Sequence, residues 1–185
     1  MNSVAVDEGS IEGELALVVR AQRGDVRAFE QLYLLYRNRI YGLCMRLVRN
    51  TAVAEDCTQQ AFINVWASLP GFKARSSFGT WIHRIAANVA IGDRRKVARS
   101  AEGFSPAVEA IGGPITFDTP VEVRDIEAAI QALPDGARDV LILCGVYGFS
   151  HAEVASVLGI AEGTCRAQLH RAREILRDKL QPDGK

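Results

Sequence analysis

The sequence predicts an all-α protein of two small helical domains, a helical bundle and a helix-turn-helix domain, joined by a flexible linker. Apolar residues recur at spacings of three and four through most of the 185 residues, and no stretch alternates with the period of two that marks a strand. The helical period fails only over 99–121, a window that contains glycines and prolines. Hydrophobic residues make up 48% of the chain, enough for a core on each side of that window.

Four segments follow from this division. Residues 1–23 form an N-terminal segment to which we assign no element, and residues 24–98 form the helical bundle. Residues 99–121 form the linker, and residues 122–181 form the helix-turn-helix domain.

Three amphipathic helices are expected in the first domain. The first begins after Asp25, a good N-cap residue, and the second after Thr51, another candidate cap. The second ends at Pro70-Gly71, and the third begins after Ser76-Ser77 and runs to about Ala98. Their expected apolar faces are Phe29, Leu32, Tyr36, Ile40, Leu43 and Leu47; Val53, Cys57, Ala61, Val65 and Leu69; and Phe78, Trp81, Ile82, Ile85 and Val89.

In the second domain the helical period resumes at Val123, breaks at Pro134 and continues to Cys144. Two more helices are expected over 150–158 and about 162–180. Gly159 between them can adopt the left-handed conformation that reverses the chain. A short helix, a turn with glycine and a longer basic helix form the geometry of a major-groove reader.

Basic residues gather at two places although the net charge is zero, with 22 Lys and Arg against 22 Asp and Glu. Residues 73–99 carry seven basic side chains against one acidic, and residues 163–180 carry five against two. Phe72, Phe78 and Trp81 interleave with the first cluster, as a surface that stacks unpaired bases requires. A charged run is often only a solvated helix face. Two basic helices, one in each domain, favour binding to nucleic acid.

The last helix carries side chains suited to DNA. Arginine can bind guanine, glutamine can bind adenine and glutamate can accept from cytosine, whereas Arg171 and Arg173 are better placed for phosphates. A plain helical hairpin with a basic exterior is the alternative. The candidate contacts are Glu162, Thr164, Arg166, Ala167, Gln168, His170, Arg171 and Arg173.

Other classes of protein are disfavoured. No apolar run approaches the roughly 18 residues that span a bilayer, and acidic residues precede the first apolar run, so a cytoplasmic protein without membrane insertion is expected. No GxSxG, P-loop, Rossmann or HExxH pattern occurs, so no catalytic residue, cofactor or small-molecule substrate is expected.

The cysteines also favour a simple interpretation. They form no CxxC pair and have no histidine at zinc-ligand spacing, so no metal is expected. Each falls on an apolar stripe, which favours small buried side chains in a reducing compartment and leaves a redox pair open. The four are Cys44, Cys57, Cys144 and Cys165.

Four segments together cover most of residues 14–181. They are GDVRAFEQLYLLY (24–36), AEDCTQQAFINVWASL (54–69), FKARSSFGTWIHRIAANVAIGDRRK (72–96) and LPDGARDVLILCGVYGFSHAEVASVLGIAEGTCRAQLHRAREIL (133–176). In this order they resemble the extracytoplasmic-function group of sigma factors of the sigma-70 family. The resemblance implies a non-catalytic subunit that binds core RNA polymerase, directs it to promoters and helps open them, under the control of an anti-sigma factor. It also implies sigma region 2 over 24–98 and sigma region 4 over 122–181.

The resemblance implies three sites. A polymerase-docking segment would use Asp56, Gln59, Gln60, Phe62 and Asn64, with Phe62 left open as a core residue. A loop that captures a base of the melted −10 element, with the helix after it, would use Phe72, Lys73, Arg75, Ser76, Ser77, Phe78, Trp81, Asn88, Arg94 and Arg95. The two serines are left open as helix caps. The candidate DNA contacts on the last helix, listed above, would read duplex DNA at −35.

Three departures limit what is carried over. Ala161 stands where the family commonly has serine, Cys165 stands where valine is usual, and Ala167-Gln168 replaces a frequent Ser-Arg pair. The family's common −35 sequence is therefore not assumed. The rival is a stand-alone helix-turn-helix repressor or activator, which would need residues 24–98 to supply a dimer surface or a ligand-binding domain.

Overall fold

The computed structural model describes residues 8–101 and 121–180, with side chains described over 13–99 and 126–180. The chain divides into two compact units, Met1–Ser105 (unit 1) and Pro106–Lys185 (unit 2). Every regular element in the described ranges is helical, which confirms the all-α prediction. The predicted linker lies mostly outside the described residues. None of the helices described is long and apolar enough to span a membrane.

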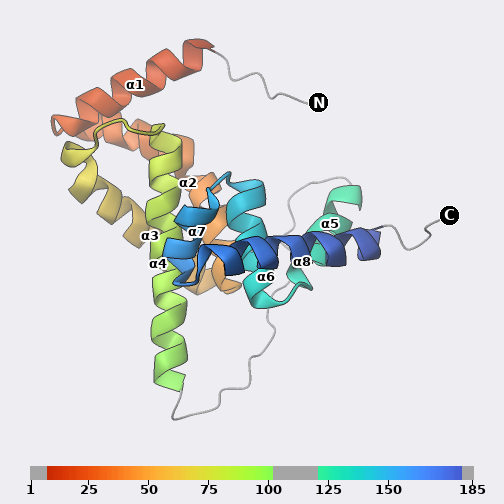
Figure 1. The fold of residues 1–185 in the computed structure, drawn as a ribbon. Helices are drawn as coiled ribbons and strands as arrows, with labels where there is room; N and C mark the ends of the chain where they lie inside the picture. Colours follow the sequence, from red (N-terminus) through yellow and green to blue (C-terminus); the bar gives the residue numbers. More distant parts are fainter. Residues whose placement is uncertain (1–7, 102–120, 181–185) are drawn as a thin grey trace. The chain divides into compact units, whose positions relative to one another are not determined.

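In unit 1 the three predicted helices pack against one another, and a further helix packs on them (Figure 1). The elements are α1 (Glu8–Gln22), α2 (Val26–Val48), α3 (Thr51–Ser68), the 3₁₀ turn η1 (Leu69–Gly71) and α4 (Phe78–Ala101). Fully buried apolar side chains from α2, α3 and α4 form the core, among them Leu32, Ile40, Leu43, Val65 and Ile82. The predicted apolar faces therefore do build the bundle.

Helix α1 is the element that the sequence analysis did not assign. Only Val18 and Ala21 of its described apolar side chains are buried, while Leu15 is exposed, so its apolar stripe is too narrow to predict a helix. Polar contacts near both ends of the helix add to this packing, and one of them is made by Gln22 to the carbonyl oxygens of Leu69 and Phe72. The Tyr36 hydroxyl donates to the Glu14 carboxylate at 2.8 Å, and burial together with that carboxylate raises the pKa of Tyr36 well above its usual range.

Side chains at the predicted caps begin the helices of unit 1, with one correction. The Asp25 carboxylate accepts from the backbone N–H groups of α2, as predicted. Helix α3 is capped by Asn50, whose carboxamide oxygen accepts from Val53 N–H at 3.1 Å, and not by Thr51, which is its first helical residue. The Ser77 hydroxyl accepts from the first turn of α4 at 3.1 Å. Helix α4 then continues to Ala101, slightly beyond the predicted end.

Unit 2 consists of the helices that the sequence predicts. The elements are α5 (Val121–Gln131), α6 (Asp135–Val140), the π-helical turn η2 (Leu141–Val146), α7 (His151–Leu158) and α8 (Glu162–Leu180). Ser150 and Glu153 form a reciprocal capping box at the start of α7, which stabilises its first turn. Gly159 ends α7 with φ 61°, the left-handed conformation expected of it.

A buried cation lies in the core of unit 2. The Arg138 side chain is 2% exposed, and its Nη1 lies 2.9 Å from Asp135 Oδ1. Its Nη2 lies 3.8 Å from Oδ1 of Asp139, which is also buried. Because two charges removed from water must compensate each other, this cluster requires α6 to keep its position against the surrounding apolar side chains.

We expect Arg138→Ala to destabilise unit 2 by about 3–5 kcal/mol, because it leaves a cavity and removes a buried cation beside the buried Asp139 carboxylate. Hydrogen exchange of the α7 and α8 amides measures the effect. The exposed Arg177→Ala control should change stability by less than about 0.5 kcal/mol. Both tryptophans, Trp66 and Trp81, lie in unit 1, so their fluorescence should report unchanged unfolding of that unit. Equal protection in the Arg138 and Arg177 variants would contradict the prediction.

Candidate nucleic-acid interface

The loop 72–77 between η1 and α4 has a defined backbone. The Gln22 amide donates to the carbonyl oxygens of Leu69 at 3.3 Å and Phe72 at 2.8 Å, which ties the start of the loop to α1. Ala74 has φ 51°, a left-handed conformation that costs a residue with a side chain about 1–2 kcal/mol. Lys73 and Arg75 beside it are exposed. The loop therefore presents two cations from a fixed backbone.

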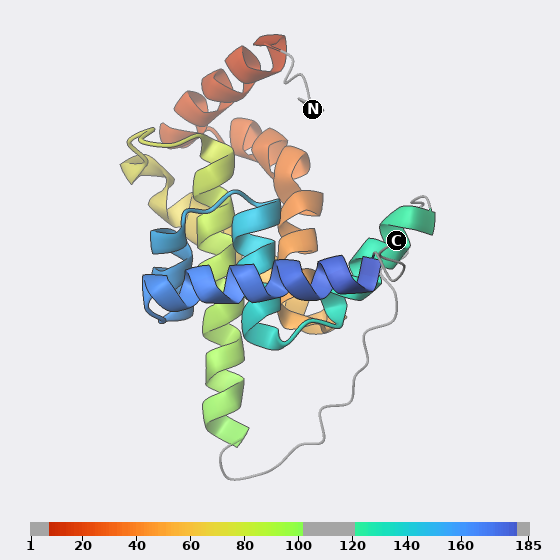
Figure 2. The same cartoon turned by 45° about the vertical axis from the view of Figure 1, so that its right-hand side comes forward.

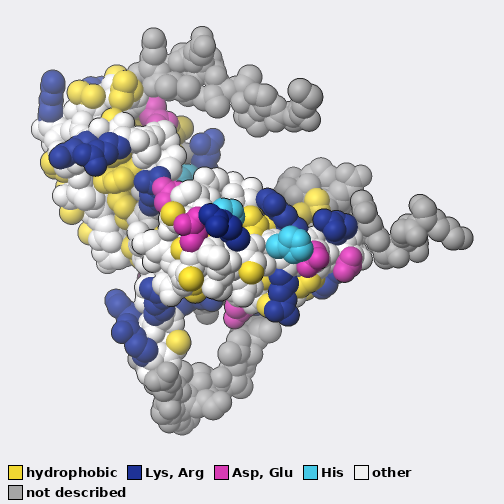
Figure 3. All heavy atoms as spheres, viewed as in Figure 1, with side chains coloured by type: hydrophobic (Ala, Val, Ile, Leu, Met, Phe, Trp, Pro, Cys, Tyr) yellow, Lys and Arg dark blue, Asp and Glu magenta, His cyan; other side chains and the backbone are white. Residues whose placement is uncertain are grey.

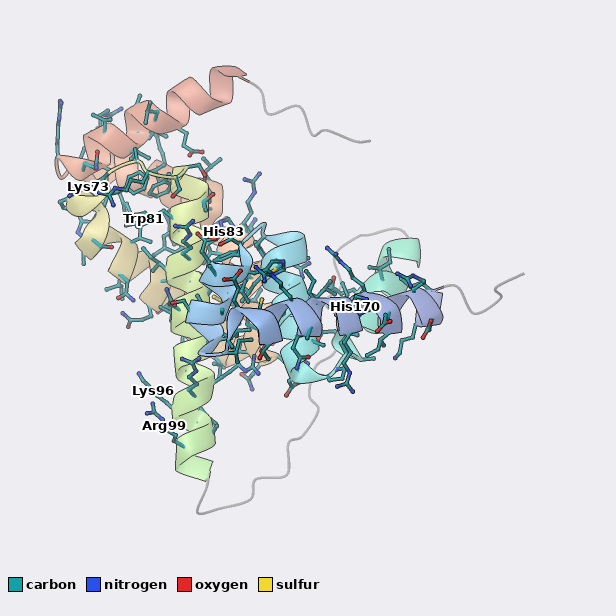
Figure 4. The ribbon with its side chains drawn as sticks, viewed as in Figure 1. Lys73, Trp81, His83, Lys96, Arg99 and His170 are labelled. Atoms are coloured by element: carbon teal, nitrogen blue, oxygen red, sulfur yellow. The ribbon has the colours of Figure 1, made fainter. Side chains whose placement is uncertain are left out.

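Aromatic rings support this loop. Phe72 and Trp81 lie with ring centroids 4.7 Å apart and 35° between planes, and both are partly exposed. Phe78 is buried and packs edge-on against Tyr36, with centroids 5.4 Å apart. Phe78 therefore belongs to the core beneath the loop, and Phe72 and Trp81 are the partly exposed rings of this group. Lys73 lies in the loop before α4 and Trp81 lies in the first turn of α4, so both are at the same end of that helix (Figure 4).

The other predicted −10 residues follow α4 away from the loop. Asn88 and Arg95 are exposed and Arg94 is partly exposed. The C-terminal part of α4 extends past α2 and α3 (Figure 1 and Figure 2), and Lys96 and Arg99 project from it (Figure 4). Because a helix rises about 1.5 Å per residue, Trp81 and Arg95 lie about 21 Å apart along the axis. One base cannot contact both ends, but a strand of several nucleotides can.

The exposed face of α3 carries the predicted docking residues. Asp56, Gln59 and Gln60 are exposed, and Asn64, partly exposed, accepts from the Gln60 amide at 2.9 Å. Phe62 is buried against Tyr33, with centroids 4.7 Å apart, so it is a core residue, the alternative that the sequence left open.

One residue on this face was missed. Ile63 is 61% exposed and lies three residues after Gln60, on the same polar stripe. An apolar residue at a polar-face position was the signal that could have identified it. Trp66, one turn further along α3, is 37% exposed and leans on Phe29, with centroids 4.7 Å apart.

A shallow groove of about 470 Å³ lies between α3 and α4. Its polar lining combines predicted docking residues with the predicted −10 residue Asn88. Burial and the carboxylates of Asp93 and Asp56 raise the pKa of Cys57 in this groove to about 11, so its thiol stays protonated and is a poor nucleophile. The polar side chains are Asp56, Gln60, Asn64, Asn88, Asp93 and Lys96.

The predicted recognition helix, α8, presents one apolar and one polar face. Cys165, Leu169 and Ala172 are buried against the rest of unit 2. Basic side chains lie along the outer face of α8, and His170 is among them (Figure 3 and Figure 4). The exposed candidates are Glu162, Thr164, Arg166, Ala167, His170, Arg171 and Arg173.

One ion pair and one histidine–carboxylate contact lie on this face. Arg166 pairs with Glu162 one turn earlier, and His170 Nδ1 lies 3.3 Å from the Glu174 carboxylate. All four side chains are exposed, so each contact contributes little stability and can be exchanged for another partner.

Gln168 is the exception among the recognition candidates. It is only partly exposed, and a side chain at Gly136, near the start of α6, would lie 3.5 Å from its amide nitrogen. Gln168 therefore lies beside α6, whereas its neighbour Ala167 faces solvent.

Three of the histidine and cysteine side chains form a cluster. His83 is half-buried against Tyr36, and burial lowers its pKa. Cys144, His151 and Cys165 bring their ligand atoms within 4.8 Å of one another, the one such group in the described ranges. The sequence analysis expected no metal ligands.

Comparisons with known proteins agree on one family. The family described as "Sigma-70 region 2" matches residues 32–100, and "Sigma-70, region 4" matches residues 124–176. The RNA polymerase sigma-H factor of Pseudomonas aeruginosa is 36% identical over 184 residues, covering 92% of this chain and 95% of that protein. The ECF RNA polymerase sigma-E factor of Escherichia coli is 34% identical over 179 residues, covering 90% and 93%.

Two solved structures share the fold. The sigma factor RpoE in complex with the anti-sigma factor NepR from Bartonella quintana has a TM-score of 0.66 and 26% identity, over 84% of this chain and 98% of that one. CnrH in complex with the cytosolic domain of CnrY has a TM-score of 0.57 and 24% identity, over 93% and 99%.

Proposed function

The chain belongs to the extracytoplasmic-function group of the sigma-70 family, and we propose that it directs core RNA polymerase to promoters through three surfaces. In this proposal region 2 spans 24–98, region 4 spans 122–181 and the linker 99–121 connects them. The single observation that carries the proposal is the loop 72–77, where fixed backbone, accessible aromatic rings and two cations meet. RNA synthesis itself belongs to the polymerase.

The loop and α4 would hold the melted −10 strand. Opening duplex DNA costs a few kcal/mol for each base removed from the stack, and stacking on an aromatic ring returns about 1–3 kcal/mol. Phe72 and Trp81 offer such rings, and Lys73 and Arg75 lie beside them for the phosphates. Ser77 caps α4, so its hydroxyl supports the loop, while Ser76 remains available to a base.

The strand would then follow α4. Asn88, Arg94 and Arg95 continue the surface for about 21 Å beyond Trp81, the reach of several nucleotides. In this arrangement Phe78 supports the aromatic pair from the core and does not contact DNA.

The outer face of α8 would read duplex DNA at −35. Arg166 suits guanine once it releases Glu162, Glu162 suits cytosine, and Ala167 suits a thymine methyl group. Arg171 and Arg173 suit phosphates. Thr164 and His170 complete the exposed surface, whereas Gln168 contributes from the side of α6.

The exposed face of α3 would dock on core polymerase. Asp56, Gln59, Gln60 and Asn64 supply polar contacts, and Ile63 supplies an apolar contact among them. An apolar residue surrounded by polar groups is the arrangement found at the centre of many interfaces.

We also infer control by an anti-sigma factor. The likeness to RpoE, solved in complex with the anti-sigma factor NepR, supports this partner. The stand-alone regulator is not favoured, because the chain matches sigma factors over both of its units.

Transcription start mapping tests the proposal. Purified chain is added to bacterial core polymerase with a pool of promoter fragments, and the 5′ ends of the transcripts are sequenced. We expect defined starts that depend on the chain, each preceded by shared −10 and −35 elements. Tight duplex binding without polymerase, and no chain-dependent starts, would instead assign the chain to the stand-alone regulators.

Docking is tested with Ile63→Ala. We expect it to weaken binding to core polymerase by about 1–2 kcal/mol, because the side chain would be buried at the interface. Leu15→Ala on α1 removes an apolar side chain of similar exposure, 57%, and should leave the affinity unchanged. Asp56→Ala should also weaken polymerase binding, with duplex binding by unit 2 unaltered. Equal affinities for the Ile63 and Leu15 variants would exclude this face.

Base reading is tested with Arg166→Ala. If Arg166 binds a guanine, the variant should lose about 1–3 kcal/mol for the preferred −35 duplex and little for unrelated duplexes. Arg177→Ala, near the end of α8, should cause only a small loss that is uniform across sequences. Binding is measured at one fixed salt concentration, because phosphate contacts depend strongly on salt. A uniform loss in the Arg166 variant would make it a phosphate contact.

A further inference from the structure

Three side chains from three elements of unit 2 meet at one point. Cys144 lies in η2, His151 is the first residue of α7, and Cys165 lies in the first turn of α8. The Cys144 sulfur is 3.7 Å from His151 Nδ1, and the Cys165 sulfur is 3.6 Å from the same nitrogen. The ligand atoms of all three lie within 4.8 Å of one another. These residues play no part in the surfaces assigned above.

The separations match the edges of a metal tetrahedron. With Zn–S of about 2.3 Å, Zn–N of about 2.0–2.1 Å and tetrahedral angles, sulfur and nitrogen ligands are about 3.6 Å apart. Both sulfur–nitrogen distances in the cluster are within about 0.1 Å of this value. Two of the three edges between the protein ligands therefore have the length that zinc needs, and the sulfur–sulfur edge lies within 4.8 Å.

We propose that Cys144, His151 and Cys165 form a zinc site that joins η2, α7 and α8. Two thiolates and an imidazole nitrogen are a donor set that zinc prefers, and water would take the fourth position. Cys165 is buried, while Cys144 and His151 are partly exposed, so the ion can enter from solvent. Binding releases the two thiol protons, so affinity rises with pH.

A disulfide between the two sulfurs is the competing chemistry. Its formation removes two protons and two electrons from the thiols, so it requires an external oxidant. It would also leave the imidazole without a role, although Nδ1 faces both sulfurs. A metal accounts for all three side chains.

The site would act on the recognition helix. Cys165 lies on the inner side of α8, directly before Arg166 in the chain, and His151 is fixed by the capping box at the start of α7. A bound ion would hold the first turn of α8 against α7 and η2, the turn from which Glu162 and Thr164 project. Metal binding itself does not depend on the proposed function, because it is measured without DNA or polymerase.

Cobalt titration of the full chain tests the site. The chain is reduced, freed of metal with a chelator and titrated with Co²⁺, then with Zn²⁺. We expect one equivalent of cobalt to produce thiolate-to-cobalt charge transfer and the visible bands of tetrahedral cobalt, and zinc to abolish both. Zinc should raise the thermal unfolding temperature by several degrees, because it binds only the folded chain.

Variants assign the ligands. Cys144→Ser and His151→Gln should lose the cobalt bands and the thermal shift. Cys57→Ser is the matched control, because Cys57 and Cys44 form a second buried pair of cysteines without a histidine. It should keep both signals. His151→Gln leaves the Ser150–Glu153 cap in place, so it carries the test if a cysteine variant does not fold by circular dichroism.

Three outcomes would overturn the site. They are no cobalt bands in the unchanged chain, bands that survive His151→Gln, and bands lost equally in Cys57→Ser. A Cys144–Cys165 crosslink that forms readily on mild oxidation of a chain that binds no cobalt would assign the pair to redox chemistry instead.

Discussion

The end of α3 is the point on which unit 1 depends. A helix that stops leaves carbonyl groups without partners, and α3 stops at Ser68, just before the exposed Pro70-Gly71. The Gln22 amide supplies donors to the carbonyls of Leu69 and Phe72. One side chain thereby links α1 to the exit of the chain from α3 and to the start of the loop that carries Phe72.

In unit 2 a buried charged side chain fixes the packing of the helices. Its core is small, and the buried Arg138 places a cation where an apolar side chain would ordinarily lie. Such a cation contributes little net stability but makes alternative packings costly, because any packing that separates it from Asp135 and Asp139 leaves a buried charge. The buried Arg138 therefore keeps α6 in one position against the longer α8.

Most of the fold could be predicted because its signals are local. Asp25, Ser150 and Gly159 begin or end helices through contacts within four residues, and the apolar stripes report burial directly. Helix α1 could not be predicted, because it is held by polar contacts to residues 22 to 50 positions away. The cluster at His151 was missed for the same reason, since its partners lie seven and fourteen residues away, outside usual zinc-ligand spacing.

The candidate sites divide along the same line. The sequence shows which residue types lie on the polar faces of the helices. It does not show which of the candidate side chains are exposed and which are buried. Phe62 and Phe78 were candidate contact residues from the sequence, but both lie in the core. Ile63 is of a residue type that usually lies in a core, but it is exposed on the surface.

The ion pair between Arg166 and Glu162 affects how Arg166 would select a base. In the free chain it pairs with Glu162, and an exposed pair one helical turn apart is worth about 0.3–0.5 kcal/mol. A bidentate contact with guanine is worth about 1–3 kcal/mol, so the pair cannot block that contact. It can hold the guanidinium near the N-terminal end of α8 before DNA arrives, which reduces the side-chain entropy lost on binding. In the proposed complex, the departure of Arg166 would leave Glu162 as an unpaired carboxylate beside the bases, where it would favour a cytosine amine over a phosphate. The two residues would therefore select bases together, Arg166 by donating to guanine and Glu162 by accepting from cytosine.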